Sequence, residues 1–496
     1  MLNLPILSIT IFLPLLGALY ITFFTSENKS KKKQNYISWV ATSISIVTLI
    51  VTTYLLSIFD GDQNSLQFTE KYKWIDIIGL EYFVGVDGLS LFFIFLSALL
   101  SLICIIVSSF TTTKNLKEFL ICFLLLESFC IGVFSSLNLL LFYCFFEIIL
   151  VPMYIIIGTW GGRNKIYAAT KFFLYTFLGS VILLLSLIYI YTQTSTFNMI
   201  ELNVLLPKLP LETQKILWIT MFFSFAIKIP IPPFHTWLPD AHVQAPTAGS
   251  VILAGILLKF GGYAFLRILI PMLPHASKAF SEYVIWISSF SIIYSSLVAY
   301  VQTDIKKMIA YSSIAHMGYV TGGIFSLTKK GIIGAVFQMI SHALVSSALF
   351  LIIGMLYERH RTKEINNYGG IASSMPVLST LFMIAMLGSV GLPGFSGFIG
   401  EFLSIAGIYE VNPLMGVVSS FGMVLGALYM LKLYKKVVFG YSKNKAIAKF
   451  IDLDLYETIA VIPLIILIIY MGILPNRILS IIETPVTTID NLYKFL

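Results

Sequence analysis

The stretch FAIKIPIPPFHTWLPDAHVQAPTAGSVILAGILLKFGG, from Phe225 to Gly262, holds two lysines in strongly apolar surroundings. Lys228 ends one apolar run and is followed at once by Pro230, and Lys259 lies inside a second apolar run. A charge at the centre of a bilayer costs about 2.5 to 3.5 kcal/mol on the insertion scale. Each lysine therefore needs a functional or a structural reason to be there.

The composition of the whole chain is that of a membrane protein. Hydrophobic residues make up 58% of its 496 residues and charged residues 11%, whereas charged residues alone are about a quarter of a soluble globular protein. Apolar runs of about 20 residues recur, the length that crosses a hydrocarbon core about 30 Å thick. Since open sheets cannot cross lipid, we predict an all-α, polytopic membrane protein with about fourteen transmembrane helices. The predicted spans are approximately 3–24, 37–58, 85–109, 117–134, 137–157, 170–192, 214–229, 243–270, 283–302, 307–327, 331–356, 374–392, 413–435 and 456–474, joined by connectors of which the longest is about 59–84.

A second proline- and glycine-rich break resembles the one after Lys228. It is GLPGFSGFIGEF, Gly391 to Phe402, which interrupts another apolar run. We therefore predict two inverted five-helix repeats containing broken helices, and paired breaks of this kind point to an ion path near the membrane midplane. The predicted segments are N-terminal helices in 1–116, a first repeat in 117–270, an inverted second repeat in 283–436, and a last helix with a tail in 437–496.

Glu147, near the middle of the span 137–157, is the natural partner for Lys228 if their two helices meet. With the carboxylate close, the lysine keeps its proton; with the carboxylate withdrawn, burial favours the neutral amine. The pair would then be a switch, and Pro230, which has no N–H, would free backbone carbonyls that line a hydrated pocket beside it. The alternative is a static buried ion pair.

Three more residues are candidates for a proton relay. Lys259 lies well inside its span, and a buried lysine can hold or lose a proton; its alternative role is snorkelling to the interface. His316 and His342 lie in the middles of successive spans, among serines, and imidazole can both accept and donate near neutral pH. Ordinary hydrogen-bonded core histidines are the alternative.

Glu401 follows the second break and marks a possible exit of the path, or it caps the second half-helix, where a carboxylate is favourable. Asp87, Glu127 and Arg267 are equally open between structural and secondary roles. The polar connector after Lys228, with His235, Asp240 and His242, is expected to be a folded loop that seals one end of the pocket.

No cofactor or metal site is expected in this chain, because neither the phosphate-binding nor the haem-attachment pattern is present. The cysteines lie in apolar segments and lack metal-ligand or CxxC spacing: Cys104, Cys122, Cys130 and Cys144. The net charge is +8, but the basic residues are spread over short loops, so no nucleic-acid partner is expected.

The opening stretch, together with LLLFYCFFEIILVPMYIIIGTWGG, DIKKMIAYSSIAHMGYV and GLPGFSGFIGEF, resembles the antiporter-like membrane subunits of proton-pumping NADH:quinone oxidoreductase, respiratory complex I. The likeness runs from about Gly85 to Lys436. The broader family includes subunits of multisubunit cation/proton antiporters and of membrane-bound hydrogenases. These are the alternative functions, and a purely structural arm subunit is a third.

The resemblance implies a subunit that translocates protons while redox chemistry takes place on other chains. It implies that NADH, FMN, iron–sulfur clusters and quinone belong to partner subunits, and that the neighbours are antiporter-like subunits L and N and the lateral helix of L. A bacterial inner membrane is the expected location and a mitochondrial inner membrane the alternative. The residues that match the family's functional positions are Glu147, Lys228, Lys259, His316, His342 and Glu401.

Overall fold

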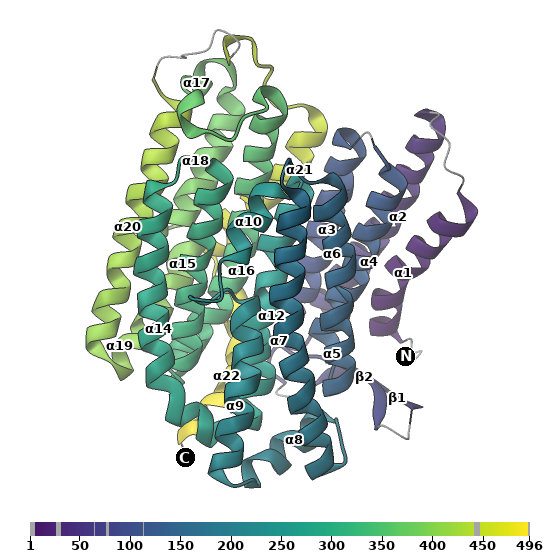
Figure 1. Ribbon diagram of the computed structural model, residues 1–496, viewed down its shortest axis with the longest axis vertical. Helices are drawn as coiled ribbons and strands as arrows, with labels where there is room; N and C mark the ends of the chain where they lie inside the picture. The colour runs from purple at the N-terminus through teal and green to yellow at the C-terminus, as the bar shows by residue number, and fades with distance from the viewer. Residues whose placement is uncertain are drawn as a thin grey trace. The chain divides into compact units, whose positions relative to one another are not determined.

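The structure is a computed structural model that describes residues 5–25, 31–63, 65–75, 79–112, 114–440 and 447–494. Within these ranges the chain is mostly α-helical (Figure 1), which confirms the predicted all-α fold class. The start of the predicted span 3–24 and residues 441–446 of the predicted C-terminal segment lie outside the described residues. The predicted inverted repeats, and the four segments drawn from them, stay a prediction.

The chain forms two compact units. Unit 1 contains residues 1–228, 256–280 and 481–496, and unit 2 contains 229–255 and 281–480. The chain thus leaves unit 1 directly after Lys228 and returns to it shortly before Lys259.

Unit 1 is built from long apolar helices, since about 20 apolar residues can satisfy their backbone in lipid only as a helix. Its most extensive helix–helix packing is between α1 and α4, between α2 and α3, and between α3 and α4. Its helices are α1 (Ile6–Phe24), α2 (Lys31–Ile58), α3 (Leu91–Thr111), α4 (Leu116–Ser135), α5 (Leu139–Ile148), α6 (Leu150–Trp160), α7 (Lys165–Thr194), α8 (Met199–Leu205), α9 (Leu211–Lys228), α12 (Leu258–Ala264) and α13 (Ile270–Met272).

A β-hairpin lies in the stretch predicted to be a plain connector. Strands β1 (Gln67–Ile75) and β2 (Leu80–Val86) pair antiparallel and lie beside the start of α1 (Figure 1). Glu70 on β1 accepts a hydrogen bond from the backbone N–H of Leu7 at 2.8 Å. The hairpin therefore supplies the carboxylate that satisfies the free N–H groups at the N-terminus of α1.

Unit 2 is centred on α16, whose apolar stretch is buried and which packs against α15, α18, α19 and α21. The contact between α16 and α19 is the closest of these, because glycines such as Gly334 and Gly400 let the two backbones approach. Its helices are α10 (Trp237–Gln244), α11 (Thr247–Ile252), α14 (Pro274–Val301, shared with unit 1), α15 (Ile305–Phe325), α16 (Lys329–His360), α17 (Ile371–Ser374), α18 (Pro376–Val390), α19 (Ser396–Val411), α20 (Pro413–Val438), α21 (Leu455–Ile473) and α22 (Asn476–Lys494, also shared).

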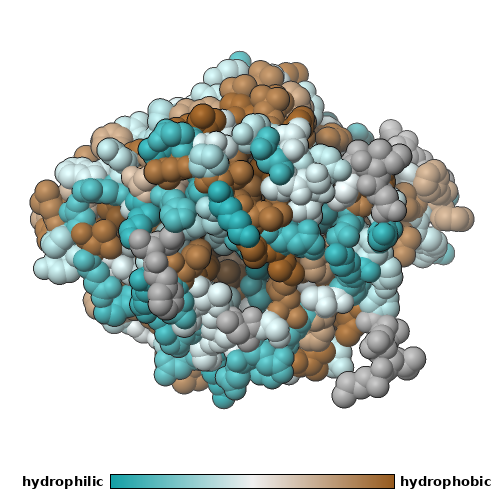
Figure 2. All heavy atoms as spheres, turned by 90° about the horizontal axis from the view of Figure 1, so that it is seen from below, coloured by the Kyte–Doolittle hydropathy of each residue, from teal (hydrophilic) through white to brown (hydrophobic). Residues whose placement is uncertain are grey.

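Each predicted span coincides with one helix or with consecutive helices, except that the span 85–109 begins in strand β2 and becomes helical only at Leu91. Among the described residues, 11 helices are long and apolar enough to cross a membrane, and further apolar helices such as α18 are shorter. The predicted second break separates α18 from α19, and the predicted tail is the helix α22. Hydrophilic side chains are spread between apolar ones at the end of the helices seen in Figure 2, as expected where helices reach a polar surface.

The prediction of a folded loop after Lys228 is wrong for residues 237–244, which form the helix α10. The reason is that side chains distant in the sequence satisfy carbonyls at the end of α10. Lys306 donates to the carbonyl of Ala245 at 2.8 Å, and Lys363 donates to that of Val243. Cations are favourable at a helix C-terminus.

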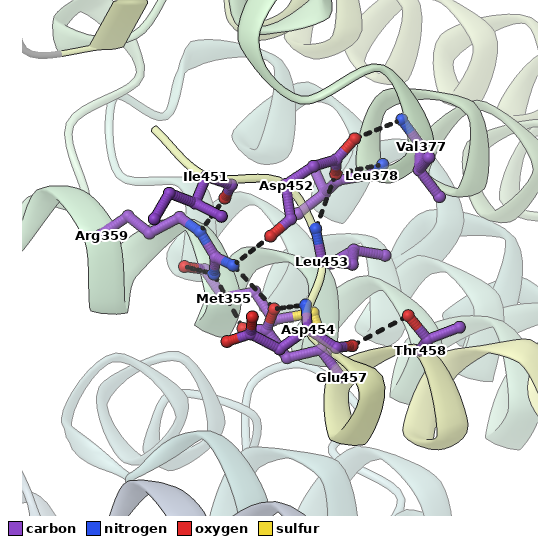
Figure 3. Close-up of polar contacts among 10 residues, drawn as sticks. All are labelled: Met355, Arg359, Val377, Leu378, Ile451, Asp452, Leu453, Asp454, Glu457 and Thr458. Atoms are coloured by element: carbon purple, nitrogen blue, oxygen red, sulfur yellow. Dashed lines mark hydrogen bonds and ion pairs between the residues drawn. The ribbon is translucent and has the colours of Figure 1, made fainter. Parts of the chain in front are cut away.

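A partly buried arginine joins three helix ends within unit 2 (Figure 3). Arg359, on the last turn of α16, donates to both carboxylate oxygens of Glu457 on α21, at 2.8 and 2.7 Å. It also donates to the backbone carbonyls of Ile451 and Asp452. The Asp452 carboxylate in turn accepts from Val377 and from its neighbour at the N-terminus of α18.

Candidate functional site

The break after α9 places Lys228 at the last residue of that helix. The chain then turns through residues 229–236, where Pro230 and the two following prolines lack the N–H that would continue a helix. The Lys228 side chain is only 6% exposed. A cation is thus held inside an apolar unit at a helix C-terminus, where the helix dipole favours it.

The charges of Glu147 and Lys228, both in unit 1, interact with each other. No ion pair within 4.0 Å joins these two described residues. The Lys228 ammonium instead lies 4.3 Å from the centre of the Phe146 ring, next to Glu147 on α5. An aromatic face attracts a cation, most strongly where water is excluded. The arrangement therefore leaves the carboxylate and the ammonium separated.

Lys259 lies on α12 and is fully buried. Short π-helical stretches, Leu253–Leu257 and Phe265–Leu269, flank α12 on both sides. Such π-helical turns interrupt the regular ladder of backbone hydrogen bonds and are frequent at functional sites. The ring of Phe260, next to Lys259, lies 6.3 Å from that of Phe146.

In unit 2, His316 and Glu401 form a buried pair. Nδ1 of His316 lies 2.9 Å from Oε1 of Glu401, and Nε2 of the same ring lies 3.3 Å from the hydroxyl of Ser389. The ring centre of His342 on α16 lies 5.5 Å from that of His316. Glu401 lies beyond the first turn of α19, so it does not cap that helix.

Two small cavities of about 10 Å³ each lie around this pair. The first is lined by His316 and His342 and by serine hydroxyls of α15, α16 and α18. The second is also lined by His316, together with Glu401, Tyr319 and Tyr429. A volume of this size is at the threshold for one water molecule, and polar walls give such a water the partners it needs.

The sequence analysis missed Gln338, which belongs to this group. This residue on α16 is 2% exposed. Its Nε2 lies 3.3 Å from Oε1 of Glu401 and 3.4 Å from Nδ1 of His316. The sequence did contain a signal for it, because Gln338 is a polar amide in an apolar span, one turn before His342.

The structure thus gathers the six predicted residues into two groups. Unit 1 holds Glu147, Lys228 and Lys259, and unit 2 holds His316, His342 and Glu401.

The residues left open between structural and secondary roles have structural partners. Arg267 pairs with Asp87 at 2.6 Å and donates to the hydroxyl of Tyr263. Glu127 accepts from Ser45 at 3.0 Å. Within the part of the chain that the structure describes, no group of three or more His, Cys, Asp or Glu side chains is placed to hold a metal ion.

Comparison with known proteins gives a family match over most of the chain. The family model described as NADH:quinone oxidoreductase/Mrp antiporter, TM matches residues 136–471. The chain is 61% identical over 495 residues to "NADH-quinone oxidoreductase subunit M" of Rickettsia bellii (strain RML369-C), with 100% of both chains covered. It is 45% identical to "NADH-ubiquinone oxidoreductase chain 4" of Marchantia polymorpha, covering 99% of this chain and 98% of that relative.

Solved structures share the same fold. A chain of respiratory complex I from Thermus thermophilus matches with a TM-score of 0.89 and 26% identity, covering 98% of this chain and 99% of that chain. A chain of the Mrp complex from Dietzia sp. DQ12-45-1b matches with a TM-score of 0.87 and 19% identity, covering 100% of this chain and 99% of that one. The second likeness concerns the fold alone.

Proposed function

Because this chain belongs to the NADH:quinone oxidoreductase/Mrp antiporter transmembrane family, we propose that it provides one proton channel in the membrane arm of its complex. It is a membrane-arm subunit of an NADH:quinone oxidoreductase, as its full-length likeness to subunit M relatives indicates. It is a multi-pass integral protein of the inner membrane. The bacterial relatives at 61% identity favour a bacterial membrane over a mitochondrial one.

The observation that carries the proposal is that each unit buries an ionisable group inside apolar helices. Charged side chains at membrane depth are costly and mark ion and proton paths. We assign proton uptake to Lys228 and Lys259, with Glu147 as the carboxylate that holds or releases the proton on Lys228. Relay falls to His316 or His342, and release to Glu401.

The redox chemistry is proposed to take place elsewhere in the complex. NADH, FMN, iron–sulfur clusters and quinone would bind partner subunits, and quinone reduction there would drive this channel by changing the charge pairing along the arm. The proposed neighbours are the antiporter-like subunits L and N and the lateral helix of L. The family description also covers the alternative function, in a multisubunit cation/proton antiporter, but the Mrp complex chain shares only the fold with this chain, at 19% identity.

The test uses the assembled complex in inverted membrane vesicles. Glu147→Gln, Lys228→Ala and Glu401→Gln should each lower NADH-driven proton uptake at least about tenfold, while the complex assembles normally. Unchanged pumping and unchanged coupled NADH oxidation in all three variants would reject the channel and leave a structural role. Purification with antiporter subunits and without a flavoprotein would favour the alternative.

A further inference from the structure

We propose that Gln338 is a positioning residue that turns its side-chain amide as a proton passes between His316 and Glu401. The inference rests on the proposed function and deepens it. Gln338 lies beside both members of the pair, and its amide is neutral and does not ionise. Its role follows from the two unlike ends of its amide, one a donor and the other an acceptor.

The donor end of the amide is used. Nε2 donates to Oε1 of Glu401 at 3.3 Å and lies 3.4 Å from Nδ1 of His316. The same carboxylate oxygen lies 2.9 Å from that ring nitrogen. This geometry suits an ionised Glu401, which can only accept hydrogen bonds.

The acceptor end is not used. Oε1 of Gln338 is buried and makes no hydrogen bond with the described residues. An unpaired buried acceptor is costly, and such an atom in a native structure needs an explanation. The explanation we offer is a second state in which this oxygen accepts a proton that the present state lacks.

The proton transfer supplies that second state. When the proton on Nδ1 of His316 passes to Glu401, the N–H bond breaks and an O–H bond forms. Imidazolium becomes imidazole, and carboxylate becomes carboxylic acid. The new O–H can donate back to Nδ1 of the ring that released the proton, which lies 2.9 Å away, or to a second acceptor beside it. A half-turn of the amide about its last side-chain bond, a torsion with two broad and similar minima, presents Oε1 of Gln338 as that second acceptor.

The backbone of α19 passes close to the amide at Gly400. A Cβ atom added at Gly400 would lie 2.5 Å from Oε1 and 2.6 Å from Cα of Gln338. Real Cβ atoms do not approach other atoms so closely. Glycine at this position therefore leaves the space that the amide oxygen occupies.

Several other ionisable groups line the cavities beside the pair. His342 lines the first cavity together with His316 and Gln338. Tyr319 and Tyr429 line the second cavity together with Glu401. Since these groups are retained in any Gln338 variant, a change in pH profile on substitution reports the amide and not the loss of one of them.

The experiment compares two variants in the assembled complex in inverted vesicles, with proton uptake and NADH oxidation measured from acid to alkaline pH. Gln338→Leu keeps an apolar side chain of similar size without the amide, and should pump at least about tenfold less at every pH, because a hydrogen bond to a charged group is lost. Gln338→Glu keeps the shape and should pump poorly at neutral and alkaline pH. At acid pH it should recover, because its protonated carboxyl again offers both a donor and an acceptor.

Ser404→Ala is the matched control. It removes a buried hydroxyl on α19, in the same interface with α16, that has no hydrogen-bond partner among the described residues. It should leave both the rate and the pH profile of pumping unchanged.

Wild-type pumping with a wild-type pH profile in Gln338→Leu would overturn the inference. If that variant does not assemble, Gln338→Glu decides alone, and recovery that is absent at acid pH overturns it. The proposed function fails separately, when Glu147→Gln and Glu401→Gln also pump normally. Loss of pumping in those two variants, with normal pumping in Gln338→Leu, rejects only the role of the amide.

Discussion

The Nδ1 atom of His316 lies 2.9 Å from the Oε1 atom of Glu401, inside unit 2 and nearly out of contact with solvent. Two ionisable groups at this distance interact strongly, so a change in one is felt by the other. We therefore expect the pair to act as one unit when either side chain is replaced.

The coupling of this pair predicts non-additive effects. Glu401→Gln and His316→Gln should each lower NADH-driven proton uptake at least about tenfold, since each substitution disables the same pair. The double variant should then pump no worse than either single variant. Proton uptake in inverted vesicles measures all three, and multiplied losses in the double variant would show that the two residues act independently.

The aromatic ring under Lys228 predicts a role for Phe146. Phe146→Leu removes the ring that lies 4.3 Å from the ammonium group, an interaction of about 2 kcal/mol when water is excluded. The lysine then loses a partner of its charged form, and proton uptake should fall several-fold with little loss of assembled complex.

Phe142→Leu is the control for that variant. Phe142 is fully buried one turn earlier on α5 and stacks on Phe146 at 5.4 Å. The substitution should cost similar packing energy and leave pumping per assembled complex unchanged. Equal pumping defects in both variants would show that Phe146 acts through packing and not through its contact with the Lys228 ammonium.

The buried pair of Asp87 and Arg267 predicts a loss of stability. Asp87→Asn keeps an oxygen that can accept from the backbone N–H of Leu89 but leaves the guanidinium, whose side chain is 14% exposed, without its countercharge. Breaking a buried pair in this way costs about 3–5 kcal/mol. The midpoint of thermal unfolding in detergent and the amount of assembled subunit should both fall.

An exposed ion pair provides the contrast. Glu212→Gln breaks the pair with Lys215, in which the glutamate side chain is 80% exposed. Pairs of this kind contribute about 0–1 kcal/mol, so the unfolding midpoint should hardly move. A similar drop for Asp87→Asn and Glu212→Gln would contradict the structural role of the buried pair.

Tyr82, on the hairpin outside the spans, predicts a pH dependence at the alkaline end. Burial raises the pKa of Tyr82 to about 12, with the Glu70 charge adding to the effect. An unfolded tyrosine ionises near pH 10. Between about pH 10 and pH 12 the folded state therefore binds more protons, and the free energy of unfolding falls as the pH rises through this window.

Tyr82→Phe removes the ionisable hydroxyl and with it this pH dependence of the free energy of unfolding. The variant loses the hydrogen bond with Ser8, so its stability is lower by a constant amount. Its unfolding midpoint should nevertheless fall less steeply above pH 10 than that of the wild type. Parallel curves for the two proteins would place the titration of Tyr82 at its ordinary value.

The spans and the two breaks could be predicted from sequence because they depend on local properties. Length and apolar content determine whether a segment crosses lipid, and Pro230 ends α9 wherever the rest of the chain lies. Helix α10 could not be predicted in this way, since its end is satisfied by Lys306 and Lys363. Those contacts exist only after distant segments have met.

The candidate site divides along the same line. Charged residues in apolar runs can be recognised from the sequence as candidates, because a charge in lipid is costly and is kept only where it has a function or a partner. Gln338 is neutral, and its importance lies in its distances to His316 and Glu401, which no pattern of residues along the chain contains. The pairing of Asp87 with Arg267, 180 residues apart, was hidden for the same reason.

The contacts of Arg359 have a consequence for how the protein is made. Its carboxylate partner, Glu457, lies 98 residues later in the chain. At about 5–20 residues per second the ribosome needs about 5–20 s to reach it. Until then the guanidinium lacks its countercharge, and an uncompensated charge opposes burial. Unit 2 therefore cannot complete its fold before α21 is synthesised, and chains that stop short of α21 should be substrates for membrane proteases.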